Sequence, residues 1–419
     1  MSNLEFRAVA QNEVADYVNT VFAAAGKSAS PEFIEEQAEA FDMSLALAAY
    51  DKGRVVGTLG SRALELSLSE NVRIPIAAVG QAAVLPTHTR MGVIHTLLMQ
   101  TMQDALDRGN PTCAWTSSDW PLWERYGSGV ATFSASHRVH APHPRDFREE
   151  IGSTGAISLV TAENLKAVLA DLHRACSNRP GSVARGPKYW HRLIARLEAG
   201  KSPDVLSDSN GLPRPFYCLL RDSQDTPKGF AIYRVHQREA AGMPDCELEL
   251  LHISAVDIAG EATLWSFLFR VDLVGSIRIG HAPLVPALKW MLKNGRKLET
   301  LSVQDHIWLR ILDPVALFQK AVLGSTNRPL RLAVVDPVAF LDPFTIEIMS
   351  DGSTTSAKLT DDAPDAALDL STLSSLVLRG LSTWDLVQSG RIKIETPGAE
   401  SALSACFMGA PAPFTDTSF

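Results

Sequence analysis

The clearest pattern in the chain is "LPTHTRMGVIHTLLMQTM", residues 85–102. After a single glycine, Gly92, apolar residues recur at spacings of one, three and four, which predicts a helix with one buried face. Gly109 is expected to end this helix. The apolar run at 74–85 predicts a strand that leads into the glycine. A strand, a glycine turn and a helix in this order leave backbone N–H groups at the helix start without intrahelical partners.

Such a junction has two interpretations. The free N–H groups and the helix dipole form a site for an anion, and a pyrophosphate is a suitable occupant. A lone glycine between a strand and a helix is, however, more often only a turn. The rest of the sequence has to distinguish the two.

Length, composition and charge limit the classes of protein. A chain of 419 residues predicts two or three domains. With 46% hydrophobic and 21% charged residues, it is typical of soluble globular proteins. The net charge of -8 repels a phosphate backbone and attracts cationic ligands, so nucleic acid is not an expected partner.

The cysteines and the N-terminus indicate a cytoplasmic location. Five cysteines lie far apart without zinc-type spacing, which predicts free thiols and no metal site. The N-terminal sequence resembles no leader peptide, and the chain contains no apolar run of about 18 residues. We therefore expect neither secretion nor a membrane partner.

The pattern of elements predicts tandem units. Residues 5–25 and 31–42 are predicted to be helices, and 45–68 is predicted to form two strands joined by a turn at Asp51–Gly53. Helices and strands start again near residue 158. This second set has no glycine turn between its last strand and the next helix, so a phosphate site is expected only in the first.

A third segment starts near residue 295, where a connecting stretch leads into further strands and a last helix. Its acidic, Ser/Thr-rich piece at 350–366 is predicted to be a surface loop. The three segments together predict an α+β protein.

The order of motifs adds a resemblance. "VLPTHTRMGVIHTLLM" followed by "TSSDWPLWERYGSGVAT" resembles the cofactor-binding motif of GNAT acyltransferases and the segment after it. Nearly the whole chain resembles the Eis family of aminoglycoside N-acetyltransferases. The stretches that carry this resemblance, in order, are "SNRPGSVAR", "KGFAIYRV", "ATLWSFLFRVDLV", "IWLRILDPVALF", "SGRIKIETPGAESALSACF" and "APFTDTSF".

The resemblance implies two GNAT-like domains followed by a sterol-carrier-like domain. It also implies a homo-oligomer, commonly a hexamer. The implied domains are 1–148 with the cofactor loop, 149–294 without one, and 295–419. The co-substrate implied is acetyl-CoA. The residues expected to bind it are Ala82, Ala83 and Val84 on the strand, Arg90, Met91, Gly92, Val93, Ile94 and His95 in the loop, and Ser118 and Asp119 beyond it.

Two features depart from the family pattern. The loop has threonine and methionine at Thr89 and Met91, so Arg90 is its only arginine. Each charge-assisted contact to a pyrophosphate is worth about 1.5 to 3 kcal/mol, so the affinity has to come largely from backbone N–H groups. Tryptophan also stands at Trp123, where the family has a tyrosine that protonates the leaving thiolate. An indole is no acid near neutral pH, so Tyr126 is the alternative donor, or else a packing aromatic.

The base implied by the resemblance is the C-terminal carboxylate of Phe419, and a frayed terminus is the alternative. Trp115, Trp120 and Trp123 are candidates either for a channel wall that contacts an ammonium group or for core packing.

Three functions follow from this sequence. The first is acetyl transfer from acetyl-CoA to a primary amine of a cationic small molecule, such as an aminoglycoside-like antibiotic or a polyamine. The second keeps the scaffold but uses a different acyl or imine-type donor in antibiotic tailoring, because such a donor needs no tyrosine acid. The third is antibiotic binding without catalysis.

Overall fold

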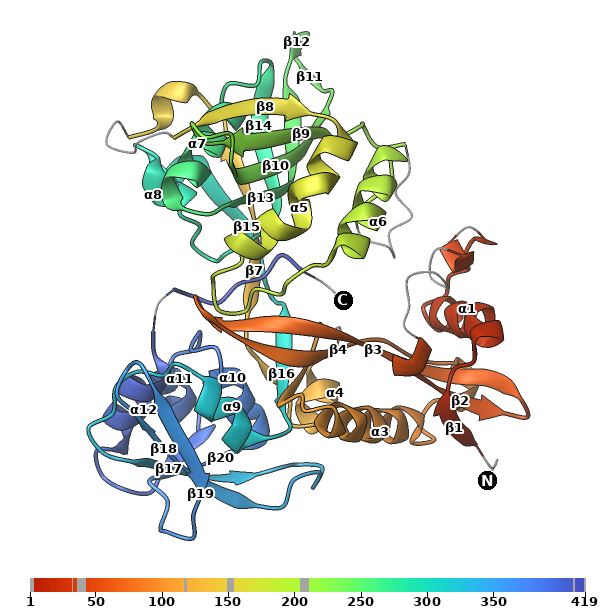
Figure 1. Cartoon of the computed structure of the whole chain (residues 1–419), viewed down its shortest axis with the longest axis vertical. Helices are drawn as coiled ribbons and strands as arrows, with labels where there is room; N and C mark the ends of the chain where they lie inside the picture. The colour runs from red at the N-terminus through yellow and green to blue at the C-terminus, as the bar shows by residue number, and fades with distance from the viewer. Residues whose placement is uncertain are drawn as a thin grey trace. The chain divides into compact units, whose positions relative to one another are not determined.

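The structure is a computed structural model that describes residues 4–31, 33–35, 43–116, 119–148, 154–203, 211–409 and 411–417. The chain divides into two compact units (Figure 1). Unit 1 contains residues 1–132 and 306–412, and unit 2 contains residues 133–305 and 413–417. Of the tail that follows α12 (Ala399–Phe407), residues 413–417 therefore belong to unit 2.

Unit 1 contains a seven-stranded sheet to which a distant segment of the chain contributes one strand. The inserted strand, β16, pairs antiparallel with both β5 and β6. The strands in spatial order are β1 (Glu5–Ala8), β2 (Ala46–Asp51), β3 (Arg54–Ser69), β4 (Val72–Val84), β5 (Thr112–Thr116), β16 (Ile307–Ile311) and β6 (Gly129–Val130).

Helices α1 (Val14–Ala24), α3 (Val93–Asp107) and α4 (Trp120–Arg125) accompany this sheet (Figure 1). The apolar positions that predicted α3 lie on its buried face. Its buried residues are Val93, Leu97, Leu98, Thr101, Met102 and Ala105. Gly109, with φ +78°, follows the end of the helix.

The remainder of unit 1 is a five-stranded sheet with helices. Its strands in spatial order are β19 (Thr355–Leu359), β18 (Phe344–Ser350), β17 (Leu330–Val335), β20 (Ala366–Asp369) and β21 (Ile392–Ile394). Its helices are α9 (Pro314–Lys320), α10 (Leu370–Leu376), α11 (Thr383–Gln388) and α12 (Ala399–Phe407).

Two contacts join the five-stranded sheet and its helices to the seven-stranded sheet of unit 1. Every residue of α10 is buried, and a Cβ on Gly129 of β6 would lie 2.0 Å from the carbonyl oxygen of Ser371. Only glycine permits this approach of β6 to α10. In addition, Arg310 on β16 pairs with Asp336 at 2.5 Å, and both side chains are fully buried.

Unit 2 is built on a second seven-stranded sheet. Its strands in spatial order are β15 (Leu298–Asp305), β7 (Phe133–His140), β14 (Val274–Ala282), β13 (Cys246–Ala255), β10 (Pro227–His236), β9 (Phe216–Arg221) and β8 (Ala156–Val160). A two-stranded ribbon, β11 (Glu239–Ala240) and β12 (Met243–Pro244), extends from it, and its helices are α5 (Ala162–Cys176), α6 (Pro187–Glu198), α7 (Ile258–Leu268) and α8 (Leu288–Met291).

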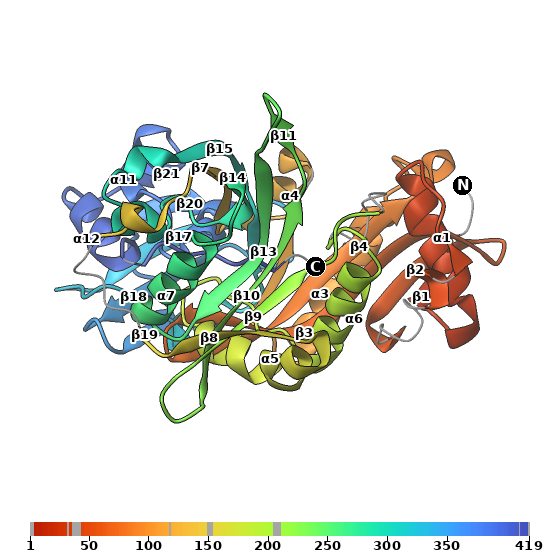
Figure 2. The same ribbon diagram turned by 90° about the horizontal axis from the view of Figure 1, so that it is seen from above.

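Alternating residues of β9 and β10 separate the helices of unit 2 into two layers (Figure 2). Leu219 and Phe230 pack with α5 and α6, whereas Leu220 and Ala231 pack with α7 and α8. Successive side chains of a strand point to opposite faces, so both faces of this sheet are covered.

The predicted α+β class is confirmed, with two mixed sheets followed by the smaller one. The helix predicted at 5–25 is wrong at its start, because residues Glu5–Ala8 form β1, which pairs with β2. Residues 31 and 33–35 are helical, and the rest of the helix predicted at 31–42 lies outside the described residues. The loop predicted at 350–366 contains β19, which pairs with β18.

The domain boundaries predicted at 148 and 294 stay predictions. Strand pairing assigns Phe133–His140 to the second sheet, and it divides the stretch after 294 between β15 in the second sheet and β16 in the first. Within the described part of the chain, no helix combines the length and apolar character needed to span a bilayer.

Candidate active site

The site begins where strands β4 and β5 separate. The two strands are parallel and pair only at Ala77 with Cys113 and Ala78 with Ala114. Strand β4 continues to Val84 beyond this pairing. Three of the predicted cofactor residues lie on this stretch: Ala82 is exposed, and Ala83 and Val84 are half-buried. The end of β4 thus offers backbone groups that its neighbour β5 does not engage.

A bulge sets the direction of this end of β4. Gly80 pairs with Gly60 and Ala83 pairs with Thr58, so two residues of β4 stand opposite one residue of β3. Gln81 has φ +54°, and its backbone carbonyl accepts a hydrogen bond from the hydroxyl of Thr58 at 2.8 Å. Bulges of this kind re-aim the residues that follow them. The sequence analysis gave Gln81 no role.

The loop from β4 to α3 uses two residues with left-handed backbones. Arg90 has φ +62° and Gly92 has φ +79°, and Gly92 is the N-cap of α3. Nothing lies within 4 Å of the position that a Cβ on Gly92 would occupy. The glycine is therefore required by its backbone conformation, and the space beside it is open.

The N-terminus of α3 is free of a side-chain cap. Gly92 provides no capping group, and the first turn carries no acidic residue. The N–H groups of Val93, Ile94 and His95 belong to this first turn, where no intrahelical acceptor exists. Together with the positive end of the helix dipole they form a site for an anion.

The corresponding helix of unit 2 is different. Helix α7 begins after β13, and the carboxylate of its N-cap, Asp257, accepts a hydrogen bond from the N–H of Gly260 at 2.7 Å. A carboxylate at this position occupies the N–H groups and repels a phosphate. The expectation that a phosphate site lies only in unit 1 stays a prediction.

A second glycine, Gly57 on β3, places the start of α3. A Cβ at this position would lie 2.4 Å from Cγ1 of Val93. Val93 is 2% exposed and is β-branched, so its side chain has little freedom to move away. Gly57 thus lets the first turn of α3 approach the sheet closely. The sequence analysis missed this residue, since a glycine inside a strand signals close packing without naming the partner.

The loop between β4 and α3 has one arginine, Arg90, and no lysine, as the sequence indicated. Arg90 is exposed and forms no hydrogen bond or ion pair with another described residue, so its guanidinium is available to a ligand. Met91 is 46% exposed. The side chain of His88 is turned towards Asp51, with Nε2 3.3 Å from a carboxylate oxygen.

Helix α4 carries Trp123, which stands at the family's tyrosine position, and ends at the C-cap residue Tyr126. Asp119, predicted to contact the cofactor, caps this helix by accepting a hydrogen bond from the N–H of Leu122 at 3.2 Å. Trp123 is 6% exposed and packs on Trp115, with ring centroids 4.9 Å apart. Trp123 is therefore an aromatic residue of the core. Of the three tryptophans, Trp120 is the exposed one.

Tyr126 lies beside the first turn of α3. Its ring centroid is 5.9 Å from that of His95, and its side chain is buried. Burial raises the pKa of the Tyr126 phenol above its ordinary value, although Arg125 opposes this. A phenol with such a pKa stays protonated at neutral pH and can donate a proton.

Three interactions hold the α4 segment in place. Glu124 pairs with Arg391, whose guanidinium also donates a hydrogen bond to the hydroxyl of Ser371 at 2.8 Å. The carbonyl of Gly127 accepts a hydrogen bond from the hydroxyl of Ser374 at 3.2 Å. Helix α10 therefore supports the segment that carries Tyr126.

The predicted strand, loop and first-turn residues follow one another along the chain, and Tyr126 lies beside one of them, His95. Ser118 and Phe419 lie outside the described residues, so their predicted roles stay predictions. Among the described residues, no group of histidine, cysteine, aspartate and glutamate is arranged to hold a metal ion.

Comparisons with known proteins agree with this geometry. An acetyltransferase (GNAT) domain model matches residues 5–131, a second one matches 181–311, and a sterol carrier protein domain model matches 314–416. These matches, together with the separated strands and the uncapped helix, define the class of protein. The chain is a GNAT-type acyltransferase with two GNAT domains and a sterol-carrier-protein domain.

Relatives narrow the family further. The chain is 26% identical over 416 residues to an uncharacterized N-acetyltransferase of Streptomyces avermitilis, and the match covers 96% of each chain. It is 26% identical over 361 residues to N-acetyltransferase Eis of Mycobacterium tuberculosis, covering 84% of this chain and 83% of the relative. The chain is accordingly an Eis-like member of the GNAT superfamily.

Solved structures share the fold. Eis1 from Mycobacterium abscessus superposes with a TM-score of 0.84 at 24% identity, covering 99% of this chain and 100% of that one. A GCN5-related N-acetyltransferase from Anabaena variabilis superposes with a TM-score of 0.82 at 15% identity, and both chains are fully covered.

Proposed function

We propose that the protein transfers an acetyl group from acetyl-CoA to a primary amine of a cationic small molecule, of the aminoglycoside or polyamine class. The observation that carries this proposal is the uncapped N-terminus of α3, which begins at the left-handed Gly92 and lies beside Tyr126. The proposed anion site and the proposed proton donor thus lie in neighbouring parts of unit 1.

The described residues fit acetyl-CoA. The open space beside Gly92 admits a phosphate close to the backbone, and the N–H groups of Val93, Ile94 and His95 would hold it. The free edge of β4 at Ala82–Val84 would hold the pantetheine arm by backbone hydrogen bonds. Arg90 would add the one cationic contact. When bound, acetyl-CoA supplies the acetyl group and a thiolate leaving group.

Tyr126 is the group we assign to the leaving thiolate. It is the buried phenol next to the anion site, and burial keeps it protonated. Trp123, the residue at the family's tyrosine position, packs into the core against Trp115 instead. A base for the attacking amine is also needed, and the carboxylate predicted for this role, that of Phe419, stays a prediction.

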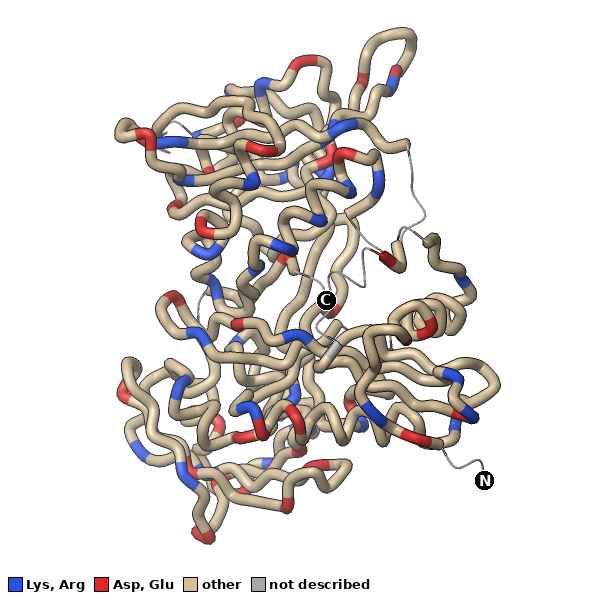
Figure 3. The backbone as a smooth tube through the Cα atoms, turned by 45° about the vertical axis from the view of Figure 1, so that its right-hand side comes forward, with Lys and Arg blue, Asp and Glu red and all other residues tan. Residues whose placement is uncertain are grey.

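Charge favours a cationic substrate. In the sequence segments 1–132 and 306–412 acidic side chains outnumber basic ones, whereas the reverse holds in 133–305. Figure 3 shows where the charged residues of the described chain lie. The excess of negative charge therefore belongs to the unit with the proposed cofactor loop. Such a field raises the local concentration of polyamines. Trp120, 48% exposed, offers an aromatic face to an ammonium group.

Calorimetric titration with acetyl-CoA, followed by a thiol-release assay with an aminoglycoside and with spermine, tests the proposal. We expect acetyl-CoA to bind and at least one amine to stimulate thiol release. No binding of acetyl-CoA at millimolar concentration would refute the proposal. Binding without turnover of either amine would refute the substrate class and retain the donor.

A further inference from the structure

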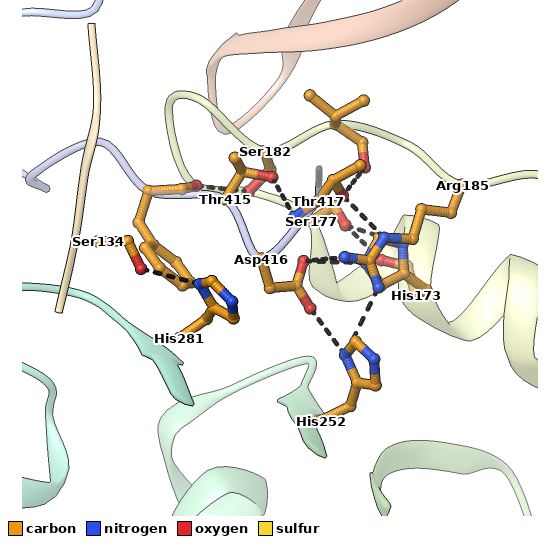
Figure 4. Close-up of polar contacts among 12 residues, drawn as sticks. Ser134, His173, Ser177, Ser182, Arg185, His252, His281, Thr415, Asp416 and Thr417 are labelled. Carbon is orange, nitrogen blue, oxygen red and sulfur yellow. Dashed lines mark hydrogen bonds and ion pairs between the residues drawn. The ribbon is translucent and has the colours of Figure 1, made fainter. Parts of the chain in front are cut away.

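The segment 413–417 is docked into unit 2 against the loop that precedes α6 (Figure 4). The N–H of Phe414 donates a hydrogen bond to the carbonyl of Pro180 at 2.9 Å. Arg185 donates from Nε to the hydroxyl of Thr417 at 2.7 Å, and this hydroxyl lies 3.4 Å from the carbonyl of Val183. Two stretches that carried the family resemblance, "SNRPGSVAR" and "APFTDTSF", thus meet in the fold.

Asp416 is the charged centre of this contact (Figure 4). Its Oδ1 lies 3.0 Å from Nη2 of Arg185 and 3.8 Å from Nε2 of His173, and its Oδ2 lies 3.2 Å from Nδ1 of His252. These partners come from the loop before α6, from α5 and from β13. One carboxylate therefore joins three separate elements of unit 2.

The partners of Asp416 are fixed by packing. The side chains of Arg185, His173 and His252 are 1%, 4% and 8% exposed. The ring of the fully buried Trp190 contacts both histidines, and the Arg185 guanidinium lies 5.0 Å from its centroid. Asp416 therefore lies between the buried cation of Arg185 and the imidazoles of His173 and His252.

The charges in this pocket favour an ionised Asp416. Desolvation acts to raise the pKa of this carboxyl, but Arg185 and the two histidines outweigh it and hold the pKa well below its usual range. Burial lowers the pKa of His252, although Asp416 opposes this. At neutral pH the pocket therefore contains an ionised carboxylate, the Arg185 cation and a neutral His252.

This arrangement places a charged contact in a segment that lies outside the strands and helices of unit 2. Desolvating a guanidinium and a carboxylate costs much of what their attraction returns, so such a pair adds little net stability compared with apolar packing. What it does provide is one defined position, because a shift of the tail by one residue would bury Arg185 without its partner.

We propose that Asp416 is a positioning residue for acetyl transfer, because its carboxylate fixes segment 413–417 in the Arg185–His173–His252 pocket of unit 2. This inference rests on the proposed function. The anion site of α3 belongs to unit 1, so loss of the pocket contact is expected to reduce turnover without reducing acetyl-CoA affinity.

The test uses the full-length protein with Asp416→Asn, which keeps the shape and removes the charge. Removing the counter-charge of the buried Arg185 is expected to raise the hydrogen-exchange rate of segment 413–417 by about 100-fold or more. We expect kcat to fall by about 100-fold, since small misplacements near a reacting centre have effects of this size. The acetyl-CoA dissociation constant is expected to change by less than about twofold, as for groups in independent sites.

The matched control is Asp272→Asn, an exposed aspartate of unit 2 outside the pocket, which should leave exchange and kcat unchanged. Thr417→Val is the second variant, because it keeps every charge and removes only the hydroxyl that accepts from Arg185. It should shift exchange and kcat in the same direction by smaller factors. Thr417→Val also tests the positioning role if Asp416→Asn fails to fold.

Unchanged exchange in both variants, or faster exchange with full kcat, would overturn the positioning role. An inactive wild type would refute the proposed function instead. In that case the exchange measurement would still show whether Asp416 holds the tail, so the two failures are distinguishable.

Discussion

The ring of Tyr126 lies 5.9 Å, centroid to centroid, from the ring of His95, the third residue of α3. This contact joins the segment after β5 to the first turn of the helix that would hold the cofactor phosphates. Trp123, in contrast, packs on Trp115 within the core. A tyrosine thus lies beside the first turn of α3, three residues after Trp123.

Tyr126→Phe removes the proposed acid and keeps the ring. We expect kcat to fall by about 10² to 10⁴-fold, the usual range for loss of a general acid, with little change in acetyl-CoA affinity. Because burial raises the pKa of the Tyr126 phenol above its ordinary value, wild-type activity should be lost through phenol ionisation only at a higher pH than a tyrosine in water would show.

The control for this change is Tyr17→Phe, which removes a buried hydroxyl without a hydrogen-bond partner from the same unit. It should leave kcat unaltered. Retention of full kcat by Tyr126→Phe, measured by thiol release, would remove Tyr126 from the mechanism.

Gly92→Ala tests the backbone of the cofactor loop. An alanine at φ +79° costs about 1 to 2 kcal/mol in the left-handed region, and the loop relieves this strain by changing its backbone. We expect acetyl-CoA to bind about 5 to 30-fold more weakly in calorimetric titration, the equivalent of that free energy.

Gly109→Ala is the matched control, since Gly109 has φ +78° and open space at the other end of the same helix. It should lower the melting temperature to a similar extent and leave acetyl-CoA affinity intact. Equal loss of affinity in both variants would show that general destabilisation, and not the loop, is responsible.

Asp336→Ala tests the buried ion pair of unit 1. Its partner Arg310 would remain fully buried without a counter-charge, which costs about 3 to 5 kcal/mol. We expect the unfolding midpoint of unit 1 to fall clearly in urea. Glu395→Gln, which breaks the exposed pair with Lys393, is expected to leave the midpoint unchanged. A stable Asp336→Ala variant would contradict the structural role of the pair.

His252 gives unit 2 a pH-dependent stability. Burial lowers its pKa below 6.5 in the folded state, so the unfolded chain binds the proton more readily. Stability is therefore complete above pH 6.5 and falls as the pH is lowered through that value. Arg185, His173 and Asp416 face this imidazole, and Asp416 stays ionised over this range because its pKa is depressed.

Thermal unfolding between pH 5 and pH 8 measures this effect. His252→Gln should lessen the loss of melting temperature of unit 2 on acidification, whereas His191→Gln, at an exposed position of α6, should leave it as in the wild type. An identical pH profile in the wild type and His252→Gln would contradict the assignment.

Local patterns in the sequence predicted most of the elements near the site. Helix α3 follows its apolar periodicity, and the two strands around Asp51–Gly53 form the predicted hairpin. The start of the chain was predicted wrongly, because the short strand Glu5–Ala8 is fixed by pairing with β2, a contact 38 or more residues away that no local pattern records. Tertiary pairing overrode propensity there.

The site was predictable only where one local motif carries it. Gly92 and the first turn of α3 follow from the order strand, glycine, helix. The close approach of Gly57 to Val93 and the pocket around Asp416 depend on residues that are far apart in sequence. Periodicity reports which face of an element is buried, but it does not report which partner buries it.

Strand β16 has a consequence for synthesis of the protein. It supplies residues 307–311 to a sheet whose other strands end by residue 130. The nascent N-terminal domain therefore keeps an open slot between β5 and β6 until all of unit 2 up to residue 305 has left the ribosome. During that interval the unpaired edges of β5 and β6 are exposed to other chains, so slow translation or truncation before residue 307 favours aggregation.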